Sequence, residues 1–264
     1  MTEIEEFQAA FPMVFRYTVP IKQHAGSADD LMGTGVLVGI GQKLFVASAG
    51  HCIKDDPVVL EENFTIPAGP TRIKILKRGV HPTLDVGFLE IEPLPDVPIL
   101  QSGGCTLEML CLQPLTKEHM VHVVGFPAVA RRTYENGVEV VKKGFGTLFL
   151  REEDASLFLD YPKTGYTWDR SSNSWSTAPF DAHPKGYSGG GVWGFMPVQP
   201  KELFSPLRHI RLYGIQFEWF EPERYVKAIA IRHWLSTVGS CCPELQPIIN
   251  GQFPEVAFGA AVNR

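Results

Sequence analysis

The chain has 264 residues, of which 44% are hydrophobic and 20% charged, and its formal net charge is −5. A chain of this length can bury its own core in one or two globular domains, and a mildly acidic chain without a basic block is a poor candidate for binding nucleic acid. Glutamates stand at the N-terminus where a signal peptide needs lysine or arginine, and no apolar run reaches the ~18 residues of a membrane span. We therefore expect a soluble, cytoplasmic protein with no membrane partner.

The glycine, proline and cysteine contents indicate a turn-rich chain without disulfides. The 25 glycines and 21 prolines exceed the roughly 12% share of these residues in average proteins, which predicts many turns between short strands. Five cysteines, an odd number that includes the adjacent pair Cys241 and Cys242, make a poor disulfide framework. We therefore expect reduced, buried thiols.

The predicted elements are short strands followed by one helix. Residues 13–21 are apolar enough for a first strand, and residues 33–40 and 44–49 predict a hairpin bounded by glycines. Further strands are expected at 72–76, 86–91, 121–125, 138–141, 146–150, 157–161, 190–195 and 212–217. Residues 93–118 have the prolines of a linker, Asn136-Gly137 predicts a hairpin turn, and residues 162–180 predict a long surface loop. Only residues 231–238 have the pattern of a helix, so the sequence predicts an all-β protein, a sandwich or a barrel.

Three segments carry the residues from which a catalytic site could be built. His51 lies in ASAGHC (47–52), Asp85 in HPTLDVGFLEI (81–91) and Ser188 in KGYSGGG (185–191). Glycines beside the serine let backbone N–H groups approach a ligand closely, and a carboxylate at the start of an apolar strand needs a hydrogen-bonding partner. A serine hydroxyl becomes a nucleophile only when a base takes its proton and an acid orients that base. The chain offers one residue of each kind.

In this order, the three segments resemble the His, Asp and Ser blocks of chymotrypsin-like (trypsin-fold) serine peptidases. The segment LYGIQ (212–216) resembles the strand that lines the family's specificity pocket, and residues 225–238 resemble its final strand and C-terminal helix. The resemblance extends over about residues 30–238. It implies two six-stranded antiparallel Greek-key barrels packed together with a C-terminal helix. The N-terminal barrel, residues 1–105, would carry the His and Asp, and the C-terminal barrel, residues 106–264, would carry the Ser and end in a helix and tail.

The resemblance also implies a serine endopeptidase that acts on protein or peptide substrates without a cofactor or metal. Ser188 would form the acyl-enzyme, His51 would act as general base and then general acid, and Asp85 would orient His51. The backbone N–H groups of Gly186 and Ser188 would form the oxyanion hole. Each backbone donor matters, because losing one typically costs ~10²–10³ in rate.

The specificity pocket is predicted less sharply. By resemblance its floor is Ala182, beside Asp181 and His183, and Gln216 and Phe217 border it. Asp181 at the floor would favour Lys or Arg in the substrate, whereas Ala182 there would favour small or apolar side chains. Both alternatives stay open because the preceding loop is long.

Two departures from the family pattern bear on regulation. Secreted members often carry Asp before the nucleophile, where it pairs with a new N-terminus, but this chain has Tyr187 there. The cysteine after the catalytic His usually bonds an upstream cysteine, and none precedes Cys52. The chain thus resembles a bacterial-type, cytosolic member without a conventional zymogen switch. We expect the proteolytic activity to depend on an activating protein partner or to be limited by narrow specificity, since an unregulated intracellular protease would damage the cell.

Three other interpretations fit parts of the sequence. A catalytically silent binding module could use the same fold, because fold does not imply function. GYSGG (186–190) also satisfies the G-x-S-x-G pattern of α/β-hydrolases, but the upstream chain lacks the alternating helices of that fold. His119 and His122 point to opposite faces of a strand, which favours surface or core histidines over metal ligands.

Overall fold

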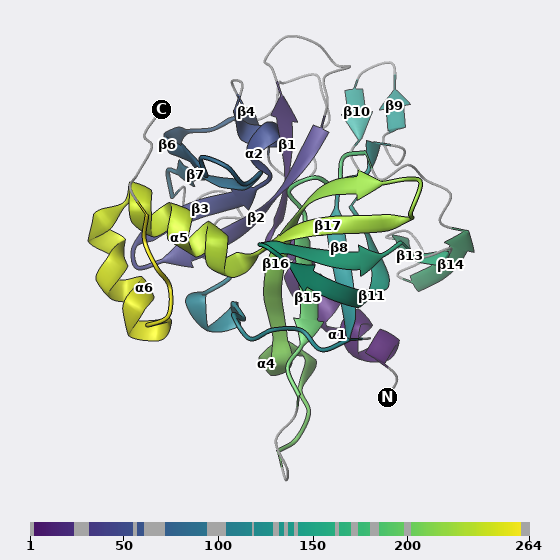
Figure 1. Ribbon diagram of the computed structural model, residues 1–264. Coiled ribbons are helices and arrows are strands. Elements are labelled where there is room, and N and C mark those ends of the chain that lie inside the picture. Colours follow the sequence, from purple (N-terminus) through teal and green to yellow (C-terminus); the bar gives the residue numbers. More distant parts are fainter. Residues whose placement is uncertain are drawn as a thin grey trace.

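The computed structural model shows a mostly β protein built from two antiparallel sheets and a C-terminal pair of helices (Figure 1). It describes residues 3–23, 32–54, 57–60, 72–93, 104–117, 119–128, 132–134, 137–139, 142–161, 164–169, 174–179, 185–197 and 202–259. The sheets lie within residues 18–91 and 120–230. A domain boundary at residue 105 stays a prediction.

The first sheet has seven strands in the order β5-β4-β1-β2-β3-β7-β6. Its strands are β1 (Thr18–Gln23), β2 (Met32–Ile40), β3 (Lys43–Ser48), β4 (Pro57–Leu60), β5 (Arg72–Ile73), β6 (Ile75–Val80) and β7 (Gly87–Ile91). The edge strands β5 and β6 are separated in the chain only by Lys74. The sheet must therefore curl until its two edges meet, and β5 with β6 serves as one bent strand.

The second sheet closes into a barrel. Its strands are β8 (Met120–Gly125), β11 (Lys143–Glu153), β12 (Ser156–Asp160), β13 (Thr164–Asp169), β14 (Ser174–Pro179), β15 (Gly191–Phe195), β16 (Ile210–Phe220) and β17 (Tyr225–Ala230). Because β12 pairs with both β17 and β11, six strands form a ring, and β13 and β14 extend from β11. A separate ribbon joins β9 (Arg132–Tyr134) to β10 (Gly137–Glu139). The predicted all-β fold class is confirmed, and the antiparallel sheets exclude an α/β-hydrolase.

The helices are short and lie mostly at the two ends of the chain. They are α1 (Glu3–Arg16), α2 (Gly50–Ile53), α4 (Pro206–His209), α5 (Ile231–Cys241) and α6 (Gln246–Gln252), with 3-10 turns η1 (Leu107–Met109) and η3 (Pro243–Leu245). None of the helices in the described part of the chain is long and apolar enough to cross a membrane.

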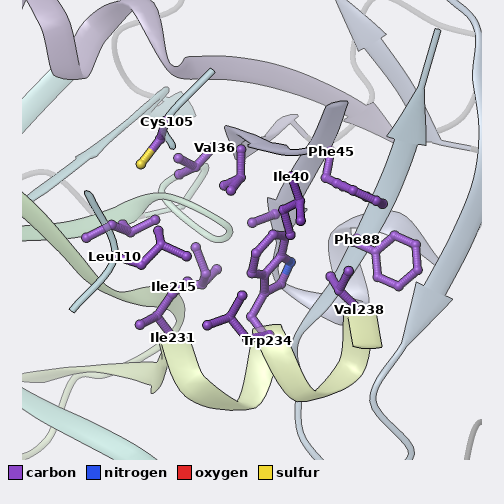
Figure 2. Packing of buried hydrophobic residues seen from close by; sticks show 14 of the residues in the cluster. Val36, Ile40, Phe45, Phe88, Cys105, Leu110, Ile215, Ile231, Trp234 and Val238 are labelled. Carbon is purple, nitrogen blue, oxygen red and sulfur yellow. The ribbon is translucent and has the colours of Figure 1, made fainter. Parts of the chain in front are cut away.

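The largest core cluster joins the two sheets through α5. Figure 2 shows the buried Trp234 of α5 among Ile40 and Phe45 of the first sheet and Ile215 of the second. The Trp234 indole donates a hydrogen bond to the Gly87 carbonyl at 3.1 Å. A large buried aromatic side chain whose polar atom is paired stabilises such a junction. The C-terminal helix is therefore part of the contact between the sheets.

The N-terminus differs from the prediction of a strand at residues 13–21. Residues 3–16 form helix α1, and β1 begins only at Thr18. Phe7, Phe11 and Val14 are buried in the largest core cluster, at the i, i+4, i+7 spacing of one helix face. The apolar residues of this segment are buried as expected, but their spacing is that of a helix face and not that of a strand.

Other boundaries also change. The predicted loop at 162–180 contains the hairpin β13–β14, and the predicted strand at 146–150 is part of the longer β11. The helix predicted at 231–238 extends to Cys241, and α6 follows it. The predicted linker contains η1 and two isolated bridges, which attach Cys105 to Val38 and Leu110 to Leu212. Asn136 of the predicted turn lies outside the described residues, although β9 and β10 pair on either side of it.

Candidate active site

His51 and Asp85 are joined by two hydrogen bonds. His51 Nδ1 lies 2.6 Å from Asp85 Oδ2, and the His51 backbone N–H donates to Asp85 Oδ1 at 2.7 Å. His51 stands in the first turn of α2, and a Cβ on the preceding Gly50 would lie only 3.0 Å from Asp85 Oδ1. A glycine at this position therefore lets the carboxylate approach closely.

The carboxylate changes the acid–base behaviour of the imidazole. The hydrogen bond that the His51 ring donates to Asp85 raises the pKa of His51 above its usual 6.5, because the neighbouring negative charge favours the protonated ring. Both side chains are partly exposed, so a substrate can reach the pair. The geometry suits an imidazole that accepts a proton at Nε2 while Asp85 holds Nδ1.

The turn that carries Asp85 is held by another histidine. His81 Nδ1 accepts hydrogen bonds from the backbone N–H of Leu84 at 3.0 Å and of Thr83 at 3.2 Å. The backbone N–H of His81 in turn donates to the Val86 carbonyl at 2.9 Å. Burial lowers the pKa of His81, which favours the neutral ring that can accept these bonds. The HPTLD motif therefore folds as a closed turn that presents Asp85.

Ser188 lies in a turn that requires two glycines. Gly186 and Gly189 have φ angles of +96° and +91°, in the region that side chains disfavour. A Cβ on Gly186 would lie 2.3 Å from the Phe126 carbonyl oxygen, so a larger residue does not fit. The predicted glycine-rich loop therefore has a strict backbone shape.

The loop is tied both to β16 and to the hydrophobic core of the second sheet, which contains Tyr187 and Phe145. The Gly189 N–H donates to the Gln216 carbonyl at 2.6 Å, and the Gln216 N–H donates to the Gly190 carbonyl at 2.8 Å. Between the two glycines that frame Ser188, Tyr187 is buried, with its ring edge-on to Phe145 at 5.2 Å between centroids. A buried aromatic residue thus anchors the loop immediately before Ser188.

The serine loop, residues 185–190, lies against the segment that follows His51. The carbonyl of Ser188 accepts hydrogen bonds from the Thr34 N–H at 2.7 Å and from the Cys52 thiol at 3.5 Å. The Ser188 hydroxyl donates to the Phe217 carbonyl at 3.4 Å, which is a long contact. The fold therefore gathers the His, Asp and Ser blocks, which are far apart in the chain, at one place.

The backbone amides proposed for an oxyanion hole have no other use in the described part of the chain. Among the described residues, neither the Gly186 N–H nor the Ser188 N–H donates a hydrogen bond. The Lys185 carbonyl accepts from the Ala128 N–H at 2.7 Å, and in a trans peptide this directs the Gly186 N–H away from Ala128. Gly186 is buried and Ser188 is half-buried. Backbone amides without a hydrogen-bond partner are rare in such surroundings, so the N–H of the serine and that of the nearby glycine suit an anionic ligand.

The predicted pocket residues are only partly placed. Asp181, Ala182 and His183 lie outside the described residues. Gln216 is buried and holds the serine loop through its backbone, while Phe217 contacts the serine hydroxyl through its carbonyl. In the described ranges, no three His, Cys, Asp or Glu side chains gather as a metal site.

Two residues at the site carried no sequence prediction of their role. Thr34 contacts the serine loop from β2, and Cys52 contacts the Ser188 carbonyl. The sequence does mark Thr34, because it is a polar residue between two glycines in the apolar segment GTGVLVGI (33–40).

The comparisons with known proteins agree with this architecture. No protein-family model matches the sequence, and no curated protein sequence matches it significantly. Among solved structures, the chain is similar to Rv3671c from M. tuberculosis H37Rv, crystallised as a serine-to-alanine mutant in its inactive form. The match has a TM-score of 0.51 at 13% identity and covers 92% of this chain and 96% of that chain. This likeness shows the fold alone, which is the trypsin-like fold.

Proposed function

We propose that the protein is a serine endopeptidase, with Ser188 as nucleophile, His51 as general base and Asp85 as the group that orients the base. The observation that carries the proposal is the carboxylate–imidazole pair at 2.6 Å, beside a serine loop with two undonated amides. A trypsin-like fold alone hosts many functions, so the proposal rests on this chemistry.

The proposed reaction has two halves. Ser188 Oγ attacks the scissile carbonyl carbon while His51 Nε2 takes the hydroxyl proton, and the N–H groups of Gly186 and Ser188 receive the resulting oxyanion. The tetrahedral intermediate collapses as His51 gives the proton to the leaving amine, which leaves an acyl-enzyme. Water, deprotonated by His51, then attacks the acyl carbon, and the bond to Ser188 Oγ breaks as His51 returns the proton to Oγ, which releases the acid and restores the serine. Asp85 stabilises the imidazolium that forms in each half.

The location and regulation of the enzyme belong to the same proposal. All five cysteines are free and buried, which suits a reducing compartment such as the cytoplasm. We expect a protein partner or narrow specificity to limit activity on peptide substrates. If the purified chain alone cleaves unfolded casein efficiently, this regulatory part is wrong.

One observation favours a second candidate, a catalytically silent binding module. The Ser188 hydroxyl donates to a carbonyl oxygen, which cannot act as a base. A protein that kept this arrangement in the presence of substrate would bind peptides without cleaving them. In an enzyme, catalytic hydrogen bonds often tighten only when substrate is bound.

A fluorophosphonate probe separates the two candidates, because it reacts only with an activated serine. We expect the wild type to be labelled, Ser188→Ala to be unlabelled, and His51→Ala to react about 10⁴- to 10⁶-fold more slowly. Ser236→Ala is the matched control, since the Ser236 hydroxyl on α5 bonds to the Ala257 carbonyl. Labelling that persists in Ser188→Ala, or no labelling of the wild type, would refute the proposed activity of the isolated chain.

A further inference from the structure

Thr34 of β2 makes four hydrogen bonds, two of which connect the first sheet to the serine loop. Its N–H donates to the Ser188 carbonyl at 2.7 Å, and its hydroxyl donates to the Gly186 carbonyl at 2.7 Å. The same hydroxyl accepts from the Phe126 N–H at 2.9 Å, and the Thr34 carbonyl accepts from the Ser48 hydroxyl at 2.7 Å. Thr34 is fully buried. One residue therefore contacts the serine loop, the end of β8 and the end of β3.

The surroundings of Thr34 leave no room for a different arrangement. A Cβ on Gly189 would lie 1.8 Å from the Thr34 carbonyl oxygen, and a Cβ on Gly125 would lie 2.8 Å from the Thr34 hydroxyl oxygen. Glycines on two other segments thus permit the close approach that these hydrogen bonds need.

The threonine hydroxyl fixes the peptide that follows Gly186. The Gly186 carbonyl belongs to the peptide between Gly186 and Tyr187, and Thr34 holds its oxygen. The preceding peptide is held by the bond from the Ala128 N–H to the Lys185 carbonyl. Both peptides that flank Gly186 are therefore fixed from outside the loop. Rotation of the preceding peptide would turn the Gly186 N–H, and rotation of the following peptide would displace the backbone that leads to Ser188 and its N–H.

We propose that the Thr34 hydroxyl is a positioning group that holds the serine loop in its oxyanion-binding shape. The inference rests on the proposed peptidase function and concerns how the same site is ordered. A hydroxyl serves here because it donates and accepts at once. Without it, the Phe126 N–H and the Gly186 carbonyl would be buried and unpaired, so the loop would move to pair them. The loop is thus ordered from within the chain, without a terminus created by cleavage.

The test compares three variants by the rate at which a fluorophosphonate inactivates the protein, resolved into its binding and reaction constants. Thr34→Val keeps the shape of the residue and removes the hydroxyl, whereas Thr34→Ser keeps the hydroxyl. The control is Thr18→Val on neighbouring β1, because Thr18 is also fully buried and its hydroxyl donates to the Val14 carbonyl at 2.9 Å. All variants are also melted, so that lost stability is separated from lost reactivity.

We expect Thr34→Val to lower the reaction constant about 10²-fold and to leave the binding constant unchanged. A displacement of the reacting groups by about 1 Å can cause a loss of this size. Thr34→Ser should react within a few-fold of the wild type, and Thr18→Val should keep the wild-type reaction constant even if it melts earlier. The proposal is overturned if Thr34→Val reacts like the wild type, if Thr34→Ser is as slow as Thr34→Val, or if Thr18→Val is slowed equally.

Two further measurements keep the outcome decisive. If Thr34→Val does not fold, Thr34→Ala takes its place, because it also removes the hydroxyl that bonds to the Gly186 carbonyl and the Phe126 N–H; a reaction constant equal to that of the wild type would then count against the proposal. Amide hydrogen exchange of residues 185–190, measured in a Ser188→Ala background, needs no activity. Faster exchange there in Thr34→Val but not in Thr18→Val supports the positioning role even if the wild type proves unreactive, and unchanged exchange overturns it.

Discussion

Replacing Gly33 with cysteine tests how closely β2 approaches the segment that carries His51. A Cβ built on Gly33 would lie 2.7 Å from the Cys52 sulfur and 3.1 Å from the Cys52 Cβ. In a disulfide the two Cβ atoms are ~3.5–4.5 Å apart, so a shift of a few tenths of an ångström turns this overlap into a bond. We therefore expect Gly33→Cys to form a disulfide with Cys52 under oxidising conditions.

The expected stabilisation follows from the length of the closed loop. Residues 33 to 52 enclose about 20 residues, and closing such a loop in the unfolded chain contributes about 3 kcal/mol. For a chain of this size each kcal/mol raises the melting temperature by roughly 2 °C, so the oxidised variant should melt roughly 6 °C above the wild type. The increase should disappear when the variant is reduced.

Thiol counting and thermal melting check this result together. The wild type has five free cysteines, and the oxidised, denatured variant should show four reactive thiols among six. Gly33→Ser is the matched control, because it introduces the same close contact without a bond and should melt below the wild type. Six reactive thiols in the variant, or equal melting of its oxidised and reduced forms, would refute the close approach of these two segments.

Three further predictions concern charge and backbone shape. Asp85→Asn should lower kcat/KM about 10⁴-fold. It should also move the acid limb of the pH profile of kcat/KM to lower pH, because Asp85 raises the pKa of His51. An acid limb at the wild-type pH contradicts this cause. Burial lowers the pKa of His122 to about 3, so the unfolded chain binds an extra proton below pH 6.5 and stability falls as the pH falls. The wild type should lose unfolding free energy between pH 7 and pH 5, and His122→Phe should make this loss about 2 kcal/mol smaller. Denaturant titrations at both pH values measure the loss, and an equal loss in the variant and the wild type contradicts this prediction. Gly189→Ala should abolish probe labelling and cost more than the roughly 1–3 kcal/mol of backbone strain alone, because its Cβ would meet a backbone oxygen of β2 at 1.8 Å. The control Gly251→Ala meets nothing within 4 Å and should raise stability by about 0.5–1 kcal/mol; similar effects of the two substitutions in denaturant titrations would contradict the close contact.

The strands that the sequence predicted well are those with strong apolar or β-branched runs bounded by glycine. Residues 33–40 and 44–49 form β2 and β3 nearly as expected, and residues 121–125 form most of β8. The N-terminal run failed because a short apolar segment fits a helix and a strand equally well until its packing partner is known. Helix α1 is stabilised by burying one face against the largest core cluster, which is a tertiary contact.

The hairpin β13–β14 failed for a different reason. Its residues, rich in Ser and Thr, have the composition of a loop. Nevertheless Tyr166 pairs with Gly144 of β11, and Trp168 pairs with Trp175 across the hairpin. Strand formation here depends on a neighbouring strand edge that the local sequence does not reveal.

The sequence by itself determined the residue types available for chemistry and their order along the chain: a histidine after a small-residue turn, an aspartate entering an apolar strand, and a serine among glycines. It also determined the all-β character through the spacing of apolar residues. Only the tertiary structure decided how these segments meet. The bond from Thr34 to the Gly186 carbonyl spans 152 residues, and its acceptor is a backbone atom that every residue has. Such contacts leave no pattern of side chains in the sequence. The glycines that permit them are needed only because backbone segments approach closely once the two sheets have packed together.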